Sequence, residues 1–435
     1  MTAWLADLIY SGGVFQSGQA MIVDDRGLIS GFSSDEDDLK NARRLPGRAM
    51  LPGLVNVHSH TFQRAIRGRT EHRTSAQRDT FWTWRESMYH AANAMSPEEI
   101  YRTTRMAFLE MALSGITAVG EFHYVHQDLD VARAILRAAK EVGLRLTLLR
   151  TAYVRAGWMK EPNPGQARFL TPDVDKFLAD TDAMIAEGAQ VGVAPHSVRA
   201  VPIDYVREVA EYAQSRGLPL HMHVSEQPAE VEASLAEYGR RPVELLHDNG
   251  VLGERFTAVH AIHITDEEAT MLGGATVCAC PTSERNLGDG AVPADRLLGA
   301  GARICFGSDS NVQIDILEDA RALEYHLRMN KLERSLVGTS RLFESATDSG
   351  ARSLGSPGGS LEIGRAADFF TIDLNDCSVA GANRESLLAH VVFSLERTAV
   401  RDVCVAGQLI VRDGKHPLQE EIVREFEEVQ RSLWK

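Results

Sequence analysis

The sequence predicts a (β/α)8 barrel joined to a smaller β-sandwich domain that is built from both ends of the chain. Three observations carry this prediction: eight short apolar runs alternate with amphipathic stretches, both chain ends consist of strand-like runs, and polar side chains follow most of the eight runs. The 435 residues exceed the roughly 250 that one barrel needs. We therefore expect the barrel over residues 51–359 and the sandwich over residues 1–50 and 360–435.

The two ends of the chain alternate apolar and polar residues in short runs, which is typical of antiparallel strands separated by tight turns. These runs are Ala6–Tyr10, Gln19–Val23 and Leu28–Gly31 near the beginning, and Ala367–Asp373, Val400–Ala406 and Gln408–Arg412 near the end. Because each end alone is too short to bury a core easily, we expect the two to combine.

The middle of the chain repeats a strand followed by a helix. Apolar residues recur at helical spacing in Pro97–Ser114, Leu129–Val142, Asp173–Glu187 and Asp204–Arg216. The eight strand-like runs are Leu54–Val57, Thr117–Phe122, Arg145–Leu149, Val191–Ala194, Leu218–His221, Phe256–Val259, Thr276–Ala279 and Arg303–Phe306. Eight such units predict a closed barrel with an active site at the carboxyl ends of its strands.

Histidines and carboxylates follow most of these runs. Because side chains alternate between the two faces of a strand, His58 and His60 point the same way and can reach one metal ion. By themselves two such histidines are more often hydrogen-bonded polar residues than metal ligands. The prediction of a metal site therefore depends on whether other strands end in matching ligands. We predict three neutral imidazoles and one carboxylate, from His58, His60, His223 and Asp309, as ligands of a divalent ion that activates water.

The composition is typical of a globular protein in a reducing compartment. The net charge is −14, and no basic run indicates a nucleic-acid surface. No apolar run reaches the roughly 18 residues that span a bilayer, and the first residues lack the features of a signal peptide. Five cysteines, an odd number, are expected to be free thiols. We therefore expect a cytoplasmic protein without a membrane or nucleic-acid partner.

The strand-end motifs resemble those of the amidohydrolase superfamily. The matching motifs are the HSH within Val57–Thr61, the HVSE of His223–Glu226, Val259-His260 and Gly307–Asp309, and the likeness continues through Gly359–Asp373. The resemblance covers essentially the whole chain and implies a hydrolase.

The same resemblance bears on the number of metal ions. Superfamily members with two metals usually bridge them with a lysine at the end of the fourth strand, and the run Val191–His196 contains no lysine. We therefore expect one divalent ion per chain, with Zn²⁺ as the first choice and Fe²⁺ as the alternative. Because barrels of this kind commonly associate, we also expect a homodimer.

Longer segments away from the predicted ligands resemble the formimidoylglutamate deiminases more narrowly. These segments are HTFQRA, FWTWRESMY, EFHYVHQDLD, HSVRAV, SEQPAEVE and NLGDG. The resemblance implies hydrolysis of N-formimino-L-glutamate to N-formyl-L-glutamate and ammonia, a reaction of histidine degradation. The partner would then be a small dicarboxylate.

The resemblance also implies a role for three catalytic side chains. Glu226, which follows His223 by three residues, would protonate the imine nitrogen instead of binding the metal. Asp309 would take a proton from water and pass it to the leaving ammonia, and His260 would hold the water and the developing charge.

Two carboxylates on a substrate require cationic partners. Arg85 and Arg199 are the best-placed guanidinium groups for bidentate binding, and both match positions of the family. Without the resemblance, Arg85 is equally well explained as a stacking partner of the neighbouring tryptophans or as a surface charge. The remaining predicted substrate-binding residues are Gln63, Tyr124 and His196.

Three alternatives stay open from the sequence. A deaminase of guanine or a related base would use the same metal site with a different pocket. Formiminoaspartate, one methylene shorter, would be distinguished by pocket length, which no motif reveals. A non-catalytic scaffold would be expected to lack metal ligands, and this chain contains each of the four predicted ones.

Overall fold

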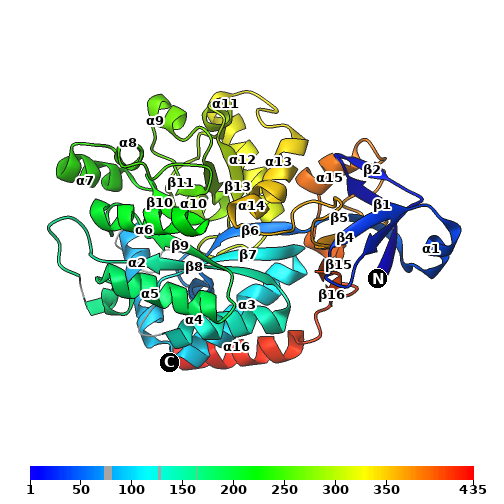
Figure 1. Cartoon of the computed structure of the whole chain (residues 1–435), viewed down its shortest axis with the longest axis horizontal. Coiled ribbons are helices and arrows are strands. Elements are labelled where there is room, and N and C mark those ends of the chain that lie inside the picture. The colour runs from blue at the N-terminus through cyan, green and yellow to red at the C-terminus, as the bar shows by residue number, and fades with distance from the viewer. Residues whose placement is uncertain (73–80, 126–128, 163) are drawn as a thin grey trace.

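The computed structural model of the chain describes residues 1–72, 81–125, 129–162 and 164–435. Two eight-stranded sheets dominate the structure and lie next to each other along its long axis (Figure 1). One sheet is parallel throughout and the other is mixed. Among the helices of these ranges, none is both long enough and apolar enough to cross a membrane.

The parallel sheet follows the order of the chain from its first strand to its last. Its strands are β6 (Leu54–Ser59), β7 (Ile116–His123), β8 (Arg145–Ala152), β9 (Val191–Pro195), β10 (Leu220–Val224), β11 (Phe256–His260), β12 (Thr276–Ala279) and β13 (Arg303–Phe306). The ring closes where Ser59 pairs with Asp309, just beyond β13. The predicted (β/α)8 barrel is therefore confirmed.

All six residues of β6 are buried, as expected for a strand covered on both faces. The helices that accompany the barrel strands are α3 (Pro97–Leu113), α4 (Leu129–Val142), α5 (Val174–Ala186), α6 (Ile203–Arg216), α7 (Pro228–Tyr238), α8 (Pro242–Asp248), α9 (Asp266–Met271), α10 (Pro281–Leu287), α11 (Ala294–Gly299), α12 (Ile316–Lys331), α13 (Thr339–Ala346) and α14 (Asp348–Ser353). Helix α3 begins where it does because Ser96 and Glu99 form a capping box around Pro97.

Two barrel strands end three residues beyond their predicted ranges, and the other six lie within two residues of theirs. The fifth was predicted at residues 218–221, which is wrong, because β10 begins two residues later and ends three residues later. Pro219 has no N–H for the ladder, although its carbonyl accepts from Val193, and the pairing with β11 continues through Val224. The third strand, β8, continues three residues past Leu149, because Arg150 is buried within it beneath Phe177 of α5.

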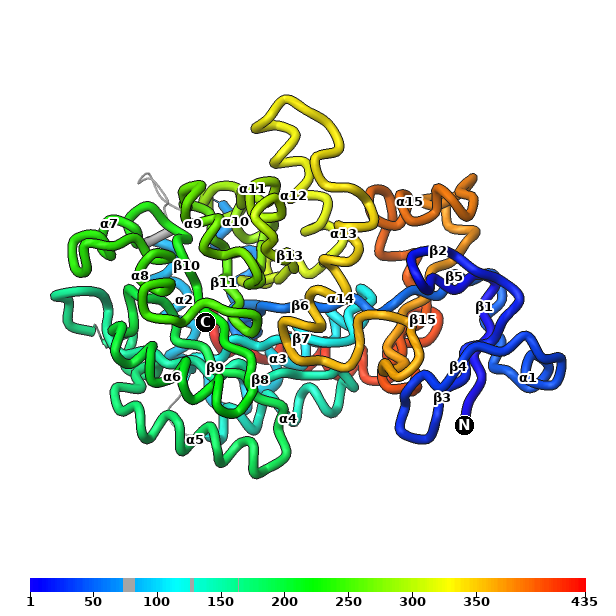
Figure 2. The backbone as a smooth tube through the Cα atoms, turned by 45° about the horizontal axis from the view of Figure 1, so that its top comes forward, coloured from blue at the N-terminus to red at the C-terminus, as the bar shows by residue number. Residues whose placement is uncertain are grey.

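The mixed sheet unites both ends of the chain. Its strands are β1 (Thr2–Ser11), β2 (Val14–Gln16), β3 (Ala20–Val23), β4 (Ile29–Ser33), β5 (Arg43–Pro52), β14 (Phe369–Asp373), β15 (Val400–Val405) and β16 (Gln408–Val411). Strand β5 joins the halves, since it pairs parallel with β1 and antiparallel with β14. Figure 2 shows the blue N-terminal and orange C-terminal segments together at one end of the molecule.

The mixed sheet has a small core of its own, in which Trp4 and Phe369 meet edge to face with ring centroids 5.4 Å apart. The remaining elements outside the barrel are α1 (Glu36–Asn41), α15 (Leu387–Phe393) and η3 (Arg397–Ala399). After the mixed sheet, the chain returns to the barrel as α16 (Gln419–Leu433), which lies along α3 (Figure 1). Arg105 of α3 donates to Glu421 and Glu425 of α16 at 2.7 Å each.

Candidate active site

The four side chains predicted as metal ligands meet at the carboxyl end of the barrel. His58 and His60 come from β6, His223 from β10, and Asp309 from the turn after β13. Nε2 of His58 lies 3.1 Å from Nε2 of both His60 and His223. Oδ1 of Asp309 lies 3.4 Å from Nε2 of His58 and 3.3 Å from Nε2 of His60. All four side chains are buried.

This group fits a tetrahedral metal ion, because ligand atoms about 2.1 Å from zinc lie about 3.4 Å from one another. The second ring nitrogens support the same assignment. Nδ1 of His60 faces the carbonyl of Phe122 at 2.8 Å, and Nδ1 of His223 faces the carbonyl of His196 at 3.0 Å. Each Nδ1 therefore carries the proton, which leaves the Nε2 lone pairs directed at a common point. Without a cation there, those lone pairs would repel.

Burial keeps two of these imidazoles, those of His58 and His223, in the form that binds metals. It lowers the pKa of His58 to about 3 and holds the pKa of His223 well below its usual value. Burial alone would raise the pKa of Asp309, but the adjacent rings of His58 and His60 hold it well below the usual range. The group thus offers three imidazoles, of which His58 and His223 are held neutral, and one carboxylate.

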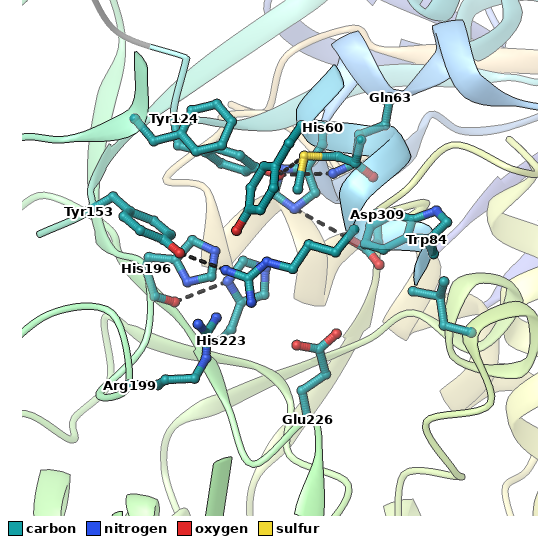
Figure 3. Close-up of a pocket in the computed structure, with 15 residues that line it drawn as sticks. His60, Gln63, Trp84, Tyr124, Tyr153, His196, Arg199, His223, Glu226 and Asp309 are labelled. Atoms are coloured by element: carbon teal, nitrogen blue, oxygen red, sulfur yellow. Dashed lines mark hydrogen bonds and ion pairs between the residues drawn. The ribbon is translucent and has the colours of Figure 1, made fainter. Parts of the chain in front are cut away.

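Glu226 and His260 lie beside the ligand group. Oε1 of Glu226 is 3.9 Å from Nε2 of His260, and the His260 ring stacks on His223 with centroids 5.6 Å apart. Glu226 does not belong to the four-residue ligand group. Its carboxylate faces the cavity (Figure 3).

Glu284 of α10 orients His260 from behind. Its Oε1 lies 3.2 Å from Nδ1 of His260 and accepts from the backbone N–H of Cys280 at 2.8 Å. Burial opposes a charge on His260, but the carboxylates of Glu226 and Glu284 raise its pKa well above the usual value. His260, Cys280 and Glu284 form a second group with ligand geometry, yet the Glu284 carboxylate is already engaged.

Backbone strain is concentrated at these strand ends. Ser225, His260 and Asp309 have φ angles of 51°, 73° and 46°, in the left-handed region that non-glycine residues rarely adopt. The closed barrel holds these conformations, for example through the hydrogen bond from the N–H of Asp309 to the carbonyl of His58. Of the three side chains, that of Asp309 lines the cavity beside the ligand group.

A cavity opens beside the ligand group (Figure 3). Its lining includes all five predicted substrate-binding residues, namely Gln63, Arg85, Tyr124, His196 and Arg199. Gln63 lies on η1 (Thr61–Ile66) and donates to the Tyr124 hydroxyl at 2.9 Å. Arg85 lies on α2 (Phe81–Ala94), a helix inside the long connection after β6, and its side chain is almost fully buried.

The family model for the amidohydrolase family matches residues 49–410. This chain belongs to the amidohydrolase family. It is 39% identical over 411 residues to a formimidoylglutamate deiminase of Pseudomonas aeruginosa, covering 89% of this chain and 90% of that protein. It is 28% identical over 375 residues to a 5-methylthioadenosine/S-adenosylhomocysteine deaminase of Natronomonas pharaonis, covering 84% of this chain and 82% of that protein.

Solved structures of amidohydrolases agree with the fold. An amidohydrolase from Brucella melitensis superposes with a TM-score of 0.92 at 33% identity, and the match covers all of both chains. An adenosine deaminase from Xanthomonas campestris with bound zinc superposes with a TM-score of 0.86 at 22% identity, over 99% of this chain and 98% of that one.

The sequence analysis did not predict several residues that line the cavity. Tyr153 is the clearest case: the third strand was predicted to end at Leu149, whereas β8 ends at Ala152 and places Tyr153 directly at the strand end. The aromatic residues Trp84, Tyr89 and Phe169 also line the cavity. A search for polar residues just after a longer third strand would have found Tyr153.

Two histidines that were given no role prove to be tied to the backbone. Nε2 of His221 lies 3.3 Å from the carbonyl of Ser353, and Nε2 of His263 lies 2.9 Å from the carbonyl of Asp289. Residues 126–128 of the segment EFHYVHQDLD, together with the side chain of Trp82, lie outside the described residues.

Proposed function

We propose that this amidohydrolase hydrolyses N-formimino-L-glutamate to N-formyl-L-glutamate and ammonia, a reaction of histidine degradation. One observation carries the proposal: Arg85 and Arg199 line the same cavity as three of the predicted metal ligands, His60, His223 and Asp309. A cavity with two guanidinium groups at one side and a metal site at the other suits a dicarboxylate whose amidine must reach the metal. The name of the Pseudomonas aeruginosa relative supports the same substrate.

The proposed chemistry assigns a task to each side chain near the metal site. A divalent ion held by His58, His60, His223 and Asp309 would supply a water of lowered pKa. Glu226 protonates the imine nitrogen, and Asp309 accepts the proton of the water and returns it to the departing amine. His260, oriented by Glu284 at 3.2 Å, donates to the attacking oxygen.

The other side of the cavity holds the substrate. Arg85 and Arg199 bind its carboxylates, and the hydrogen-bonded pair of Gln63 and Tyr124 contacts its polar backbone atoms. His196, whose pKa burial holds well below the usual value, remains neutral and can accept or donate a single hydrogen bond. We propose these roles because all five residues line the cavity.

We further propose a single Zn²⁺ per chain, a homodimer, and a cytoplasmic location. Three imidazoles and a carboxylate suit zinc, with Fe²⁺ as the alternative, and the solved adenosine deaminase with the same fold contains zinc. The domain limits of 1–50 with 360–435 for the sandwich and 51–359 for the barrel belong to the same proposal.

An ammonia-release assay on the purified, zinc-loaded protein tests the function. Its substrates are formiminoglutamate, formiminoaspartate, formiminoglycine, guanine and 5-methylthioadenosine. We expect formiminoglutamate to have the highest kcat/KM, because formiminoglycine and the two bases lack one or both carboxylates. Preference for guanine or methylthioadenosine would identify a base deaminase. Failure of the purified protein to retain stoichiometric zinc, together with no activity on any of the five, would identify a scaffold.

A further inference from the structure

Tyr153 occupies a central position among the cationic residues of the cavity. It follows β8 directly, its side chain is 1% exposed, and its ring packs on His196 with centroids 4.9 Å apart. Nη2 of Arg85 donates to the Tyr153 hydroxyl oxygen at 2.6 Å. Figure 3 shows Tyr153 and Arg199 on the same side of the cavity, across from Glu226.

Gln166 fixes the Tyr153 hydroxyl from the outer side. It lies on η2 (Pro164–Phe169), is 2% exposed, and its Nε2 donates to the hydroxyl oxygen of Tyr153 at 2.8 Å. The same Nε2 donates to the hydroxyl oxygen of Tyr89 at 3.1 Å. The Tyr153 oxygen thus accepts from a guanidinium and an amide, so it serves as an acceptor in this site.

The charges around Tyr153 agree with this acceptor role. Burial alone would raise the pKa of Tyr153, but the guanidinium groups of Arg85 and Arg199, with hydrogen bonds donated by Tyr89 and Arg199, lower it below the usual value. The neighbouring phenol behaves oppositely, because burial and Tyr153 raise the pKa of Tyr89. Both phenols lie near the two cations, but only at Tyr153 do the cations outweigh burial.

We infer that Tyr153 is a positioning residue for substrate specificity: its hydroxyl oxygen holds the Arg85 and Arg199 guanidinium groups together at one side of the cavity, so that the site selects ligands with two carboxylates. The inference rests on the proposed function and extends it to a residue outside the predicted set. The buried Arg85 and the partly buried Arg199 repel each other, and a shared acceptor between them keeps both in place before the substrate arrives.

Loss of the hydroxyl should affect the arginine pair and leave the metal site unchanged. Each guanidinium has a second partner. Arg199 donates to the carbonyl of Ala156 at 3.2 Å, and Arg85 lies over the Tyr89 ring at 5.2 Å from its centroid. In Tyr153→Phe, the two cations would move toward these partners. Binding of a dicarboxylate would then weaken much more than binding of a monocarboxylate.

Calorimetric titration of the zinc-loaded enzyme with glutarate and with butyrate tests this without requiring turnover. Tyr153→Phe should weaken glutarate binding about tenfold or more and change butyrate binding by less than about twofold. In an Arg85→Met background, the same change should add less than about twofold, because the shared contact is already gone. Tyr101→Phe is the matched control, since its hydroxyl is bound to Glu141 outside the cavity lining.

Enzyme kinetics distinguish a loss of arginine positioning from a loss of folding or of the catalytic step. Tyr153→Phe should raise KM for formiminoglutamate about tenfold and leave kcat within about threefold, with an unchanged unfolding midpoint. If wild type prefers glutarate and Tyr153→Phe binds it equally well, the inference is wrong while the proposed function stands. If wild type binds glutarate and butyrate alike, the dicarboxylate site itself is wrong.

Discussion

At the scale of single residues, the four ligand atoms of His58, His60, His223 and Asp309 lead to the first prediction. His58→Ala or Asp309→Asn should abolish turnover, because each removes a ligand, and Asp309 also carries the proton. Glu226→Gln should retain the metal and lose at least about a hundredfold in kcat, the usual scale for a positioned acid. Elemental analysis beside the ammonia assay checks both. Loss of metal in Glu226→Gln would make Glu226 a ligand.

A second residue-scale prediction concerns the arginines. Arg85→Met or Arg199→Met removes a charge-assisted contact to a substrate carboxylate and leaves the metal ligands intact. We expect kcat/KM for formiminoglutamate to fall by about thirty- to a thousandfold, or about 2 to 4 kcal/mol. Arg133→Met is the control, because that side chain is 47% exposed and pairs with Glu187 and Asp130 on the surface. Parental kinetics in both cavity variants would refute the dicarboxylate site.

Glu230 of α7 should make the free energy of unfolding depend on pH. The side chain is 5% exposed, and burial raises its pKa to about 7. Because the pKa of a glutamate in the unfolded chain is about 4.3, the folded protein binds an extra proton between about pH 4.3 and 7. This proton stabilises the folded state, and its contribution is lost as the pH rises through 7. When the pH rises from 6 to 9, the free energy of unfolding of wild type, measured in urea, should therefore fall by about 1 to 2 kcal/mol more than that of Glu230→Gln. Parallel curves for the two proteins would contradict this.

At the scale of elements, the contact between α3 and α16 attaches the C-terminal helix to the barrel. Arg105 is almost fully buried there and donates to two glutamates. Arg105→Ala should lower the free energy of unfolding by about 1 to 3 kcal/mol, because both carboxylates lose their partner. The exposed pair of Arg133 and Glu187 gives the comparison, and Arg133→Ala should cost about 0.5 kcal/mol or less. Equal urea midpoints for the two variants would show that α16 docks without Arg105.

At the scale of the whole molecule, we predict a homodimer. Sedimentation equilibrium at micromolar concentration should give twice the chain mass of 47.8 kDa. A single species at the chain mass would refute the prediction.

Much of this architecture follows from local sequence. The buried runs and the histidines after them are local features, since a strand and its carboxyl end need only a few consecutive residues. The eight barrel strands were therefore predictable, and so were His58, His60, His223 and Asp309 as a group. Strand limits were less certain where a polar residue is buried, as Arg150 is within β8.

The sequence by itself determined that a barrel forms, that the chain ends join, and which side chains lie at the strand ends. Only the tertiary structure decided what depends on contacts between distant residues. The pairing of Ser59 with Asp309 brings the carboxylate to the histidines, and α16 returns to α3 across the molecule. The hydrogen bond between Arg85 and Tyr153, 68 residues apart, is of the same kind. Local patterns report which face of an element is buried, whereas the partner across that face depends on how the whole chain closes.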